Sequence, residues 1–215
     1  LTQAYLLLMA GVFPLFFTLS GYGGITRAKA LFFFSLSGLY LLLLLLRLLA
    51  AKARPAAFAG LRRIGWAERA ALALAALALL SAIASPYGWG LLLGLGRYDG
   101  LLPLLLYIAL FIAVSSFGRL KPALLAAAAL AALVSGSVAL LQLAGYNPLA
   151  LYPAGYDYYD AGLRYSGAFL GLIGNADVLA AWYVLIIPLL LVAAWRLRFS
   201  LSKRLISLLL PAALH

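Results

Sequence analysis

Long apolar runs, separated by short charged or Gly- and Pro-rich segments, constrain the fold of this chain more than any other feature. The runs cover about residues 3–20, 30–50, 70–85, 101–118, 123–143, 176–195 and 205–215. A helix of about 20 apolar residues crosses the roughly 30 Å hydrocarbon core of a bilayer. Only 10% of the residues are charged, whereas about one quarter are charged in soluble domains. The sequence therefore predicts an all-α fold, a polytopic bundle of transmembrane helices.

The distribution of Lys and Arg predicts the orientation of these runs in the membrane. Twelve of the 16 basic residues lie in or next to the connections 51–69, 119–121 and 196–204. Lys and Arg accumulate in cytoplasmic loops, so these alternate connections are expected inside, together with the N-terminus. The expected outer connections are 21–29, 86–100 and 144–175, and four of the five acids lie in or next to them. The same bias accounts for the net charge of +11, and no nucleic-acid partner is expected.

The last apolar run, which ends at His215, is too short to cross a membrane. As a helix, residues 205–215 rise only about 16 Å, half of the hydrocarbon core. We therefore expect about six complete spans and a truncated seventh, in a single transmembrane domain covering residues 1–215 that forms the N-terminal part of a longer chain. The sequence has no Cys, and its one His is the last residue. A metal site built from His and Cys is therefore excluded within this chain, and no cofactor is expected.

Two short outer segments share the pattern R-Y-x-G. The first, Arg97-Tyr98-Asp99-Gly100, leads into the fourth apolar run, and the second, at 164–167, precedes the sixth. Each places a guanidinium at the outer membrane boundary, where its planar fork can bond two oxygens of a phosphate. Anchoring of Arg and Tyr in the lipid headgroup region explains the same pattern equally well.

The outer connection between the fifth and sixth runs is rich in Tyr and contains Asp157 and Asp160. Tyr rings combine an apolar face with a hydroxyl, which suits sugars and equally suits an interfacial aromatic belt. The two carboxylates suit acid–base catalysis or, as the commoner alternative, simple exposure to solvent. Neither choice is settled by the residues.

The segment 166–174 contains three Gly and is expected to be non-helical, dipping into the outer leaflet. Such backbone is tolerated at membrane depth only when protein covers it or when it lines a wet cavity. Asn175 is placed to cap the following helix, and Asp177 lies in the first turn, where the helix dipole favours an acid. Capping explains both residues without a binding role. Pro188 is expected to kink the same helix.

Two segments resemble the bacterial O-antigen ligase and O-antigen polymerase family. Residues 164–191 resemble its R-x-x-G-x-F … G-N-x-N-x-x-A segment, and residues 85–111 resemble its S-x-x-P … G … R-x-x-G-L segment. The resemblance extends over most of the chain in hydropathy and order of spans, and it is specific in these two segments. Ala176 and Asp177 replace the family's Pro and second Asn, and residues 170–173 are additional.

This resemblance implies a metal-independent glycosyltransferase in the bacterial cytoplasmic membrane. Family members transfer a glycan from undecaprenyl pyrophosphate, on the outer face, to lipid A core, to another lipid-linked repeat or to a protein. Arg97 and Arg164 are then expected to bind the pyrophosphate. The residues expected beside them at the substrate are Tyr98, Tyr165, Asn175 and Asp177.

The acceptor hydroxyl needs a general base. Asp99 is the carboxylate beside a candidate arginine and is the candidate for this catalytic role. In family members, a large outer loop in the second half of the chain supplies further basic residues and, in ligases, a proposed His base.

Two other classes of function remain open on the sequence. A polysaccharide or lipid flippase, or a secondary transporter, also has broken helices and polar groups near a midplane site. Ion-coupled carriers place ionisable residues inside several spans, and the span interiors here are nearly free of them. The other class is a non-catalytic membrane subunit, in which the outer Arg residues serve only as lipid anchors.

Overall fold

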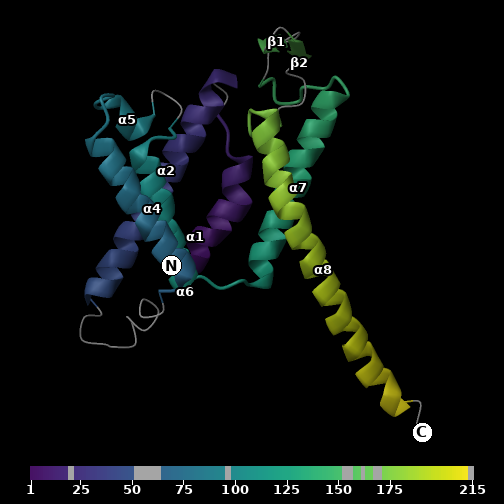
Figure 1. Ribbon diagram of the computed structural model, residues 1–215. Helices are drawn as coiled ribbons and strands as arrows, with labels where there is room; N and C mark the ends of the chain where they lie inside the picture. Colours follow the sequence, from purple (N-terminus) through teal and green to yellow (C-terminus); the bar gives the residue numbers. More distant parts are fainter. Residues whose placement is uncertain are drawn as a thin grey trace. The chain divides into compact units, whose positions relative to one another are not determined.

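The computed structural model consists almost entirely of helices (Figure 1). It describes residues 1–18, 22–50, 64–94, 98–151, 157–160, 163–166 and 171–212, with the side chains of 22–23, of both strands and of 196–212 left aside. The α-helices are α1 (Thr2–Leu7), α2 (Tyr22–Ala50), α4 (Trp66–Ile83), α5 (Gly90–Leu93), α6 (Leu101–Phe117), α7 (Pro122–Leu143) and α8 (Ala176–Ala212). A π-helix, η1 (Leu8–Val12), and a 3₁₀-helix, η2 (Phe13–Leu15), follow α1. The predicted helical class is confirmed.

Among the described residues, four helices are long and apolar enough to cross a membrane by length and composition. They cover Gly24–Ala50, Trp66–Ile83, Pro122–Leu143 and Ala176–Trp195, and shorter apolar helices cover Thr2–Leu15 and Leu101–Phe117. The chain is therefore a helical membrane protein in its broad class. The number of spans and their orientation remain predictions.

The first apolar run, predicted at 3–20, is not one regular helix. The α-helical geometry of α1 gives way to the π-helix η1, then to η2, and Phe16 after η2 is extended. Pro14 explains this break, because proline cannot donate to the carbonyl four residues earlier and its ring clashes with that carbonyl. A π-bulge before the proline relieves both problems.

Two predicted connections are helical instead. The expected outer connection 21–29 lies within α2 from Tyr22 onward, and the expected inner connection 196–204 lies within α8. Neither segment contains Pro, and Lys and Arg favour helix almost as well as Leu does. Charged residues end an apolar run but do not end a helix. The ends of the apolar runs near residues 30 and 195 were therefore wrong as predictions of where these two helices begin and end. Pro188 lies inside α8 without ending it.

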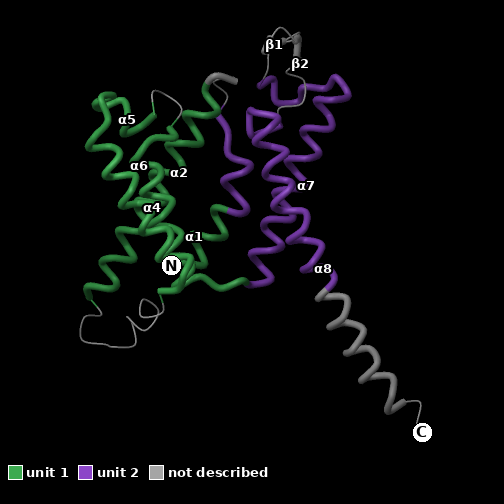
Figure 2. The backbone as a smooth tube through the Cα atoms, in the orientation of Figure 1, with its two compact units in different colours: residues 1–9, 23–120 green, residues 10–22, 121–215 purple. Residues whose placement is uncertain are grey.

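The chain divides into two compact units, which Figure 2 colours separately. Unit 1 comprises residues 1–9 and 23–120, and unit 2 comprises residues 10–22 and 121–215. Each unit is described by itself below.

Stacked tyrosines form the centre of unit 1. The rings of Tyr5 in α1 and Tyr40 in α2 are parallel to within 10° and their centroids are 4.3 Å apart. Both rings are buried, and each hydroxyl has a partner: Tyr5 with Ser37 at 3.0 Å, and Tyr40 with Thr2 at 3.2 Å. Hydrogen-bonded hydroxyls of this kind hold helices together in an apolar surrounding, because a buried hydroxyl without a partner there costs free energy.

Small residues allow close packing in unit 2. A Cβ on Gly11 of η1 would lie 3.2 Å from the Ala127 side chain of α7, so these two backbones approach closely. The buried residues of α7 include Ala128, Ala131 and Ala132. Gly and Ala at helix contacts are typical of membrane proteins, because lipid solvates large apolar side chains as well as a protein interior does.

A two-stranded antiparallel hairpin follows α7 and precedes α8 in the sequence. It pairs β1 (Asp157–Asp160) with β2 (Leu163–Ser166). The sequence analysis expected a loop here and missed the strands. The two adjacent tyrosines of β1, Tyr158 and Tyr159, favour a strand, because Tyr has a high strand-forming tendency.

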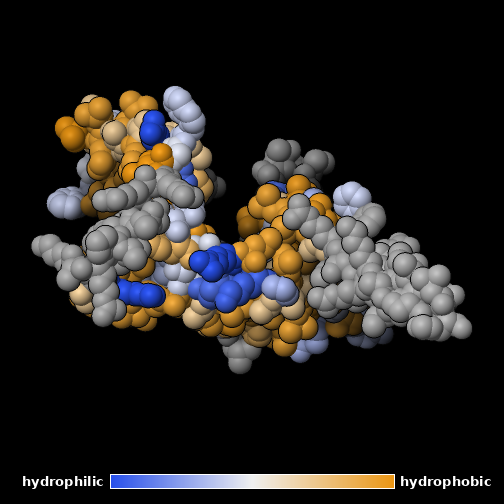
Figure 3. All heavy atoms as spheres, turned by 90° about the horizontal axis from the view of Figure 1, so that it is seen from below, coloured by the Kyte–Doolittle hydropathy of each residue, from blue (hydrophilic) through white to orange (hydrophobic). Residues whose placement is uncertain are grey.

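The outer surface of the described residues is mostly apolar, as Figure 3 shows for the face seen from below. Leucines on the helices are commonly about half exposed, for example Leu42 at 52% and Leu133 at 70%. A surface of this kind is suited to hydrocarbon rather than to water.

The corner before α6 gives a test of the packing in unit 1. A Cβ on Gly100 would clash with the Leu91 carbonyl and lie 2.6 Å from the Leu92 carbonyl, both in α5. We expect Gly100→Ala to lower the stability by about 1–3 kcal/mol, as overpacking does. The measurement is the apparent melting temperature of the full chain in detergent, followed by circular dichroism.

Gly38→Ala is the matched control, because nothing lies within 4 Å of a Cβ at that helical position. Alanine there should leave stability unchanged or raise it slightly. Equal effects of the two substitutions would show that the α5–α6 corner is not tightly packed.

Candidate functional site

The predicted site residues divide between the two units. Tyr98 and Asp99 belong to unit 1, whereas Arg164, Tyr165, Asn175 and Asp177 belong to unit 2. Arg97 lies outside the described residues, and Arg164 and Tyr165 are described only as positions in β2. A single site shared by both groups therefore stays a prediction.

A tight corner before α6 holds the described part of the first R-Y-x-G segment, residues 98–100. Gly94 ends α5 in the left-handed conformation, with φ of 77°, and Tyr98 is also left-handed, with φ of 60°. A non-glycine residue there costs about 1 kcal/mol or more, so surrounding contacts must hold it. The Tyr98 ring lies 6.2 Å from that of Phe34 in α2. Tyr98 therefore packs partly against the protein.

Asp99 is exposed and folds back over the end of α5. A Cβ placed on Gly94 would clash with the Asp99 carboxylate. An exposed carboxylate can be reached by an acceptor hydroxyl, as a general base must be. Its role as the catalytic residue stays a prediction.

The hairpin register places Arg164 opposite Tyr159 and Tyr165 opposite Tyr158. Both predicted binding residues of the second R-Y-x-G segment therefore lie on an ordered strand rather than in an irregular loop. Asp157 pairs with Ser166 and Asp160 with Leu163, at opposite ends of the same strand.

Asn175 caps α8, as predicted. Its side-chain oxygen accepts hydrogen bonds from the backbone amides of Asp177, at 2.8 Å, and Val178, at 3.1 Å. These amides are among the four that have no partner within a helix, and a side-chain cap satisfies them. Asp177 is exposed in the first turn, where the helix dipole stabilises its charge.

The glycine-rich segment before Asn175 is non-helical in its described part, as expected. Residues 171–174 form a turn in which Gly171 has φ of 59° and Gly174 has φ of 84°. Gly171, Leu172 and Gly174 are buried. Their backbone is therefore covered by protein, which is the condition for irregular backbone at membrane depth. Residues 167–170 lie outside the described residues.

Gln142 fixes this turn and was missed by the sequence analysis. Its side-chain oxygen accepts a hydrogen bond of 2.9 Å from the Gly171 amide, across 29 residues. The Gln142 side chain is 3% exposed, and among the described residues its NH₂ group has no partner. One carboxamide in an otherwise apolar span was the available signal, since polar groups in such helices bond to other parts of the protein.

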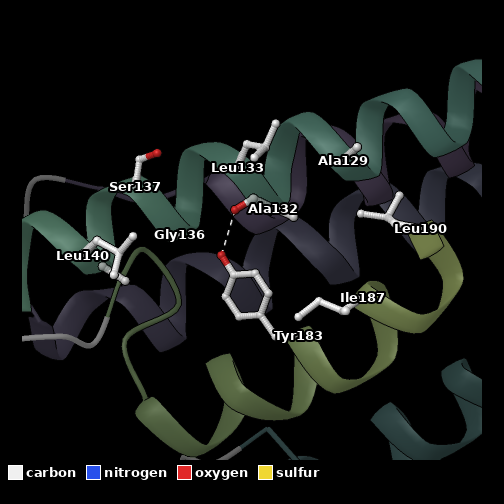
Figure 4. A pocket seen from close by; sticks show the side chains of 10 residues that line it. Ala129, Ala132, Leu133, Gly136, Ser137, Leu140, Tyr183, Ile187 and Leu190 are labelled. Atoms are coloured by element: carbon white, nitrogen blue, oxygen red, sulfur yellow. Dashed lines mark hydrogen bonds between the residues drawn. The ribbon is translucent and has the colours of Figure 1, made fainter. Parts of the chain in front are cut away.

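An apolar groove lies between α7 and α8, with a volume of about 610 Å³ (Figure 4). The α7 side of the groove is made mainly of small residues, and the α8 side carries larger ones. The lining includes Ala129, Ala132, Gly136, Tyr183, Ile187 and Leu190. Its volume lies within the range of about 300–1,000 Å³ typical of small-molecule sites.

One tyrosine crosses this groove. The Tyr183 hydroxyl donates to the Ala132 carbonyl at 2.7 Å, as the dashed line in Figure 4 shows. A Cβ on Gly136 would lie 2.7 Å from the same hydroxyl. Only glycine at 136 therefore leaves room for this bond, which ties α8 to α7.

The groove leads to the glycine-rich turn. Ala139 lines the groove, and its Cβ lies 3.7 Å from the position of a Cβ on Gly171. The same end of unit 2 carries the capped start of α8. The arrangement suits a ligand with a long apolar chain, because the lining is almost wholly apolar.

Comparison with known proteins found no matching family model, no matching curated protein and no matching solved structure.

Asn175 gives a test of the cap. Asn175→Ala removes the acceptor for two amides and should lower stability by about 1 kcal/mol, whereas Asn175→Asp keeps an acceptor and should lower it much less. Apparent melting temperatures of both variants provide the comparison. Equal losses for alanine and aspartate would contradict capping as the role of this side chain.

Gly136 and Tyr183 give a test of the contact across the groove. Gly136→Ala should lower stability in the wild-type chain by about 1–3 kcal/mol, because the new methyl displaces the Tyr183 hydroxyl. In the Tyr183→Phe background the same change should have little effect, since the crowded oxygen is gone. The double-mutant cycle measures this coupling, and additive effects would show that the two residues do not meet.

Proposed function

We propose that this chain takes part in transferring a glycan from undecaprenyl pyrophosphate to an acceptor on the outer face of a bacterial cytoplasmic membrane. The resemblance to O-antigen ligases and polymerases in two short segments suggests this reaction. The observation that carries the proposal is the apolar groove of unit 2, which reaches the turn before Asn175.

The groove has the properties that a polyprenyl chain requires. It lies between two helices that are long and apolar enough to cross a membrane, and its lining is almost entirely hydrocarbon. Leu133 and Leu140 at its rim are 70% and 67% exposed, so the groove opens to the surroundings of the helices. A lipid chain can enter such a groove sideways from the bilayer.

The polar head of the donor would lie at the outer end of unit 2. Arg164 lies on strand β2, which comes in the sequence between the Tyr-rich segment and the glycine-rich turn. A guanidinium can bond two phosphate oxygens at once, so Arg164 is assigned to the pyrophosphate. In the proposal Arg97 contributes a second guanidinium, and Tyr98 and Tyr165 flank the two.

The chemistry is the displacement of pyrophosphate from a sugar. A bond forms between the acceptor oxygen and the anomeric carbon while the bond from that carbon to the phosphate oxygen breaks. Undecaprenyl pyrophosphate leaves with the electron pair, and the guanidinium groups stabilise its growing charge. The acceptor hydroxyl loses its proton to a general base, for which Asp99 is the candidate.

Arg97 and Arg164 test the proposal. Replacing either by Ala should reduce glycan transfer about 100-fold, because loss of one preorganised donor costs about 3 kcal/mol. Lys should restore part of the rate, since it keeps the charge and loses the fork. The assay follows a labelled glycan from undecaprenyl pyrophosphate to the acceptor, with the full-length protein in proteoliposomes.

Arg69→Ala is the matched control, because Arg69 lies at the start of α4, on the face predicted to be cytoplasmic. It should leave transfer unchanged. If transfer survives both outer substitutions with normal expression, the donor-binding role is wrong. If the purified protein instead moves a labelled solute across vesicles, a transporter is the better description.

A further inference from the structure

Helix α4 is the least covered long helix of unit 1. It has no buried residue along its 18 positions, and it packs against α6. Its mean hydropathy is 1.6, which is high for a helix with so much exposed surface. An apolar helix of this kind is expected to have an apolar partner along its outer side. The exposure of its side chains distinguishes the side that faces α6 from the outer side.

The two faces of α4 differ in residue size. The half-buried positions recur with alternating spacings of three and four: Glu68, Ala71, Ala75, Ala78 and Ala82. This spacing marks a single stripe along a helix. The Glu68 carboxylate lies near the Ser115 hydroxyl, which places the stripe toward α6.

The leucines lie beside or opposite this stripe and are exposed. Their exposed fractions are 45% for Leu72, 50% for Leu74, 64% for Leu77, 43% for Leu79 and 63% for Leu80. In a soluble protein the large apolar residues would face inward. Here the stripe toward the neighbouring helix holds no leucine, and every leucine of α4 is exposed.

This distribution favours lipid over another protein helix as the partner of the leucine face. Contacts between membrane helices are enriched in Gly, Ala, Ser and Thr and in polar groups that bond across the contact. The alanine stripe toward α6 fits that description, whereas all five leucines of α4 and Ile83 are exposed, interspersed with the exposed Ala67, Ala70, Ala73 and Ala76. Leucine is solvated by acyl chains as well as by protein.

Aromatic residues mark both ends of α4. Trp66 begins the helix and is 86% exposed, and the Arg69 guanidinium lies 5.8 Å from the centre of its ring. Beyond the other end, Tyr87 is 77% and Trp89 is 87% exposed. Trp and Tyr collect at the two membrane interfaces, and an exposed Arg complements phosphate headgroups in charge.

The spacing of these ends fits a bilayer. Eighteen residues of α-helix span about 27 Å, close to the hydrocarbon thickness of about 30 Å. We propose that the leucine face of α4 lies directly against lipid acyl chains, with Trp66 and Arg69 at the headgroups of one leaflet and Tyr87 and Trp89 at those of the other. This inference does not depend on the glycosyltransferase proposal.

Tryptophan fluorescence in brominated lipid tests the assignment, because bromine quenches a tryptophan at its own depth. The four native tryptophans allow single-tryptophan chains that keep only Trp66 or only Trp89, with the others replaced by Phe. A third chain carries Leu77→Trp on a background without native tryptophan. Each full chain is reconstituted in phosphatidylcholine brominated either near the headgroup or deep in the acyl chain.

Leu77→Trp should lose most of its emission with deep bromine and less with shallow bromine. Trp66 and Trp89 should show the reverse order. Leu77→Trp should lose little emission to acrylamide relative to free tryptophan, and its oligomeric mass should match that of the wild type.

Three results would overturn the proposal. Weak quenching of Leu77→Trp at both depths would mean that protein, such as a second copy, covers the leucine face. Strong quenching of that tryptophan by acrylamide would mean that water covers it. Equal depth profiles for Trp66, Trp89 and Leu77→Trp would mean that the ends of α4 are not at the interfaces.

Discussion

Close approach of helix backbones at glycine and alanine is the constraint on which both units depend. In hydrocarbon, burying a leucine gains little, because the lipid already provides an apolar surrounding. Helices must therefore be held by van der Waals contact between small residues and by hydrogen bonds. The alanine stripe of α4, the contact between Gly11 and Ala127, and the Tyr183 hydroxyl above Gly136 are three instances.

The same constraint leaves room for the groove. Because α7 presents small side chains toward α8, the space between them is wide enough for a ligand while Tyr183 and Ala132 keep the helices joined. A larger residue at Gly136 would meet the tyrosine hydroxyl. The feature that joins the two helices therefore also shapes the candidate binding site.

Local patterns in the sequence predicted some of this structure well. Uninterrupted apolar runs between Gly, Pro and charged residues predicted α6 and α7 to within about one residue, and the position of Asn175 before a helix predicted its cap. The predicted breaks near residue 25 and residue 200 were wrong, because basic residues change hydropathy without disfavouring helix.

Other features depend on contacts that local patterns do not contain. The bond between Gln142 and Gly171 joins residues 29 apart, and the fit of Tyr183 over Gly136 joins two helices. The sequence named Asn175 as a cap and gave no sign of the partner that holds the turn before it. The sequence motif also identified Tyr98. The left-handed backbone of Tyr98 and its contact with Phe34 depend on the packing of unit 1 and were not predicted.

The continuity of α8 has a geometric consequence. Its 37 residues measure about 55 Å along the axis at 1.5 Å per residue. A rod of that length would fit inside a 30 Å hydrocarbon layer only at an inclination well beyond the roughly 40° extreme of membrane helices. If its capped start lies at the outer boundary, the part that contains Arg196 and Lys203 must emerge on the opposite side. Because α8 is continuous through Pro188, the emergent arm is a direct extension of the portion that borders the groove.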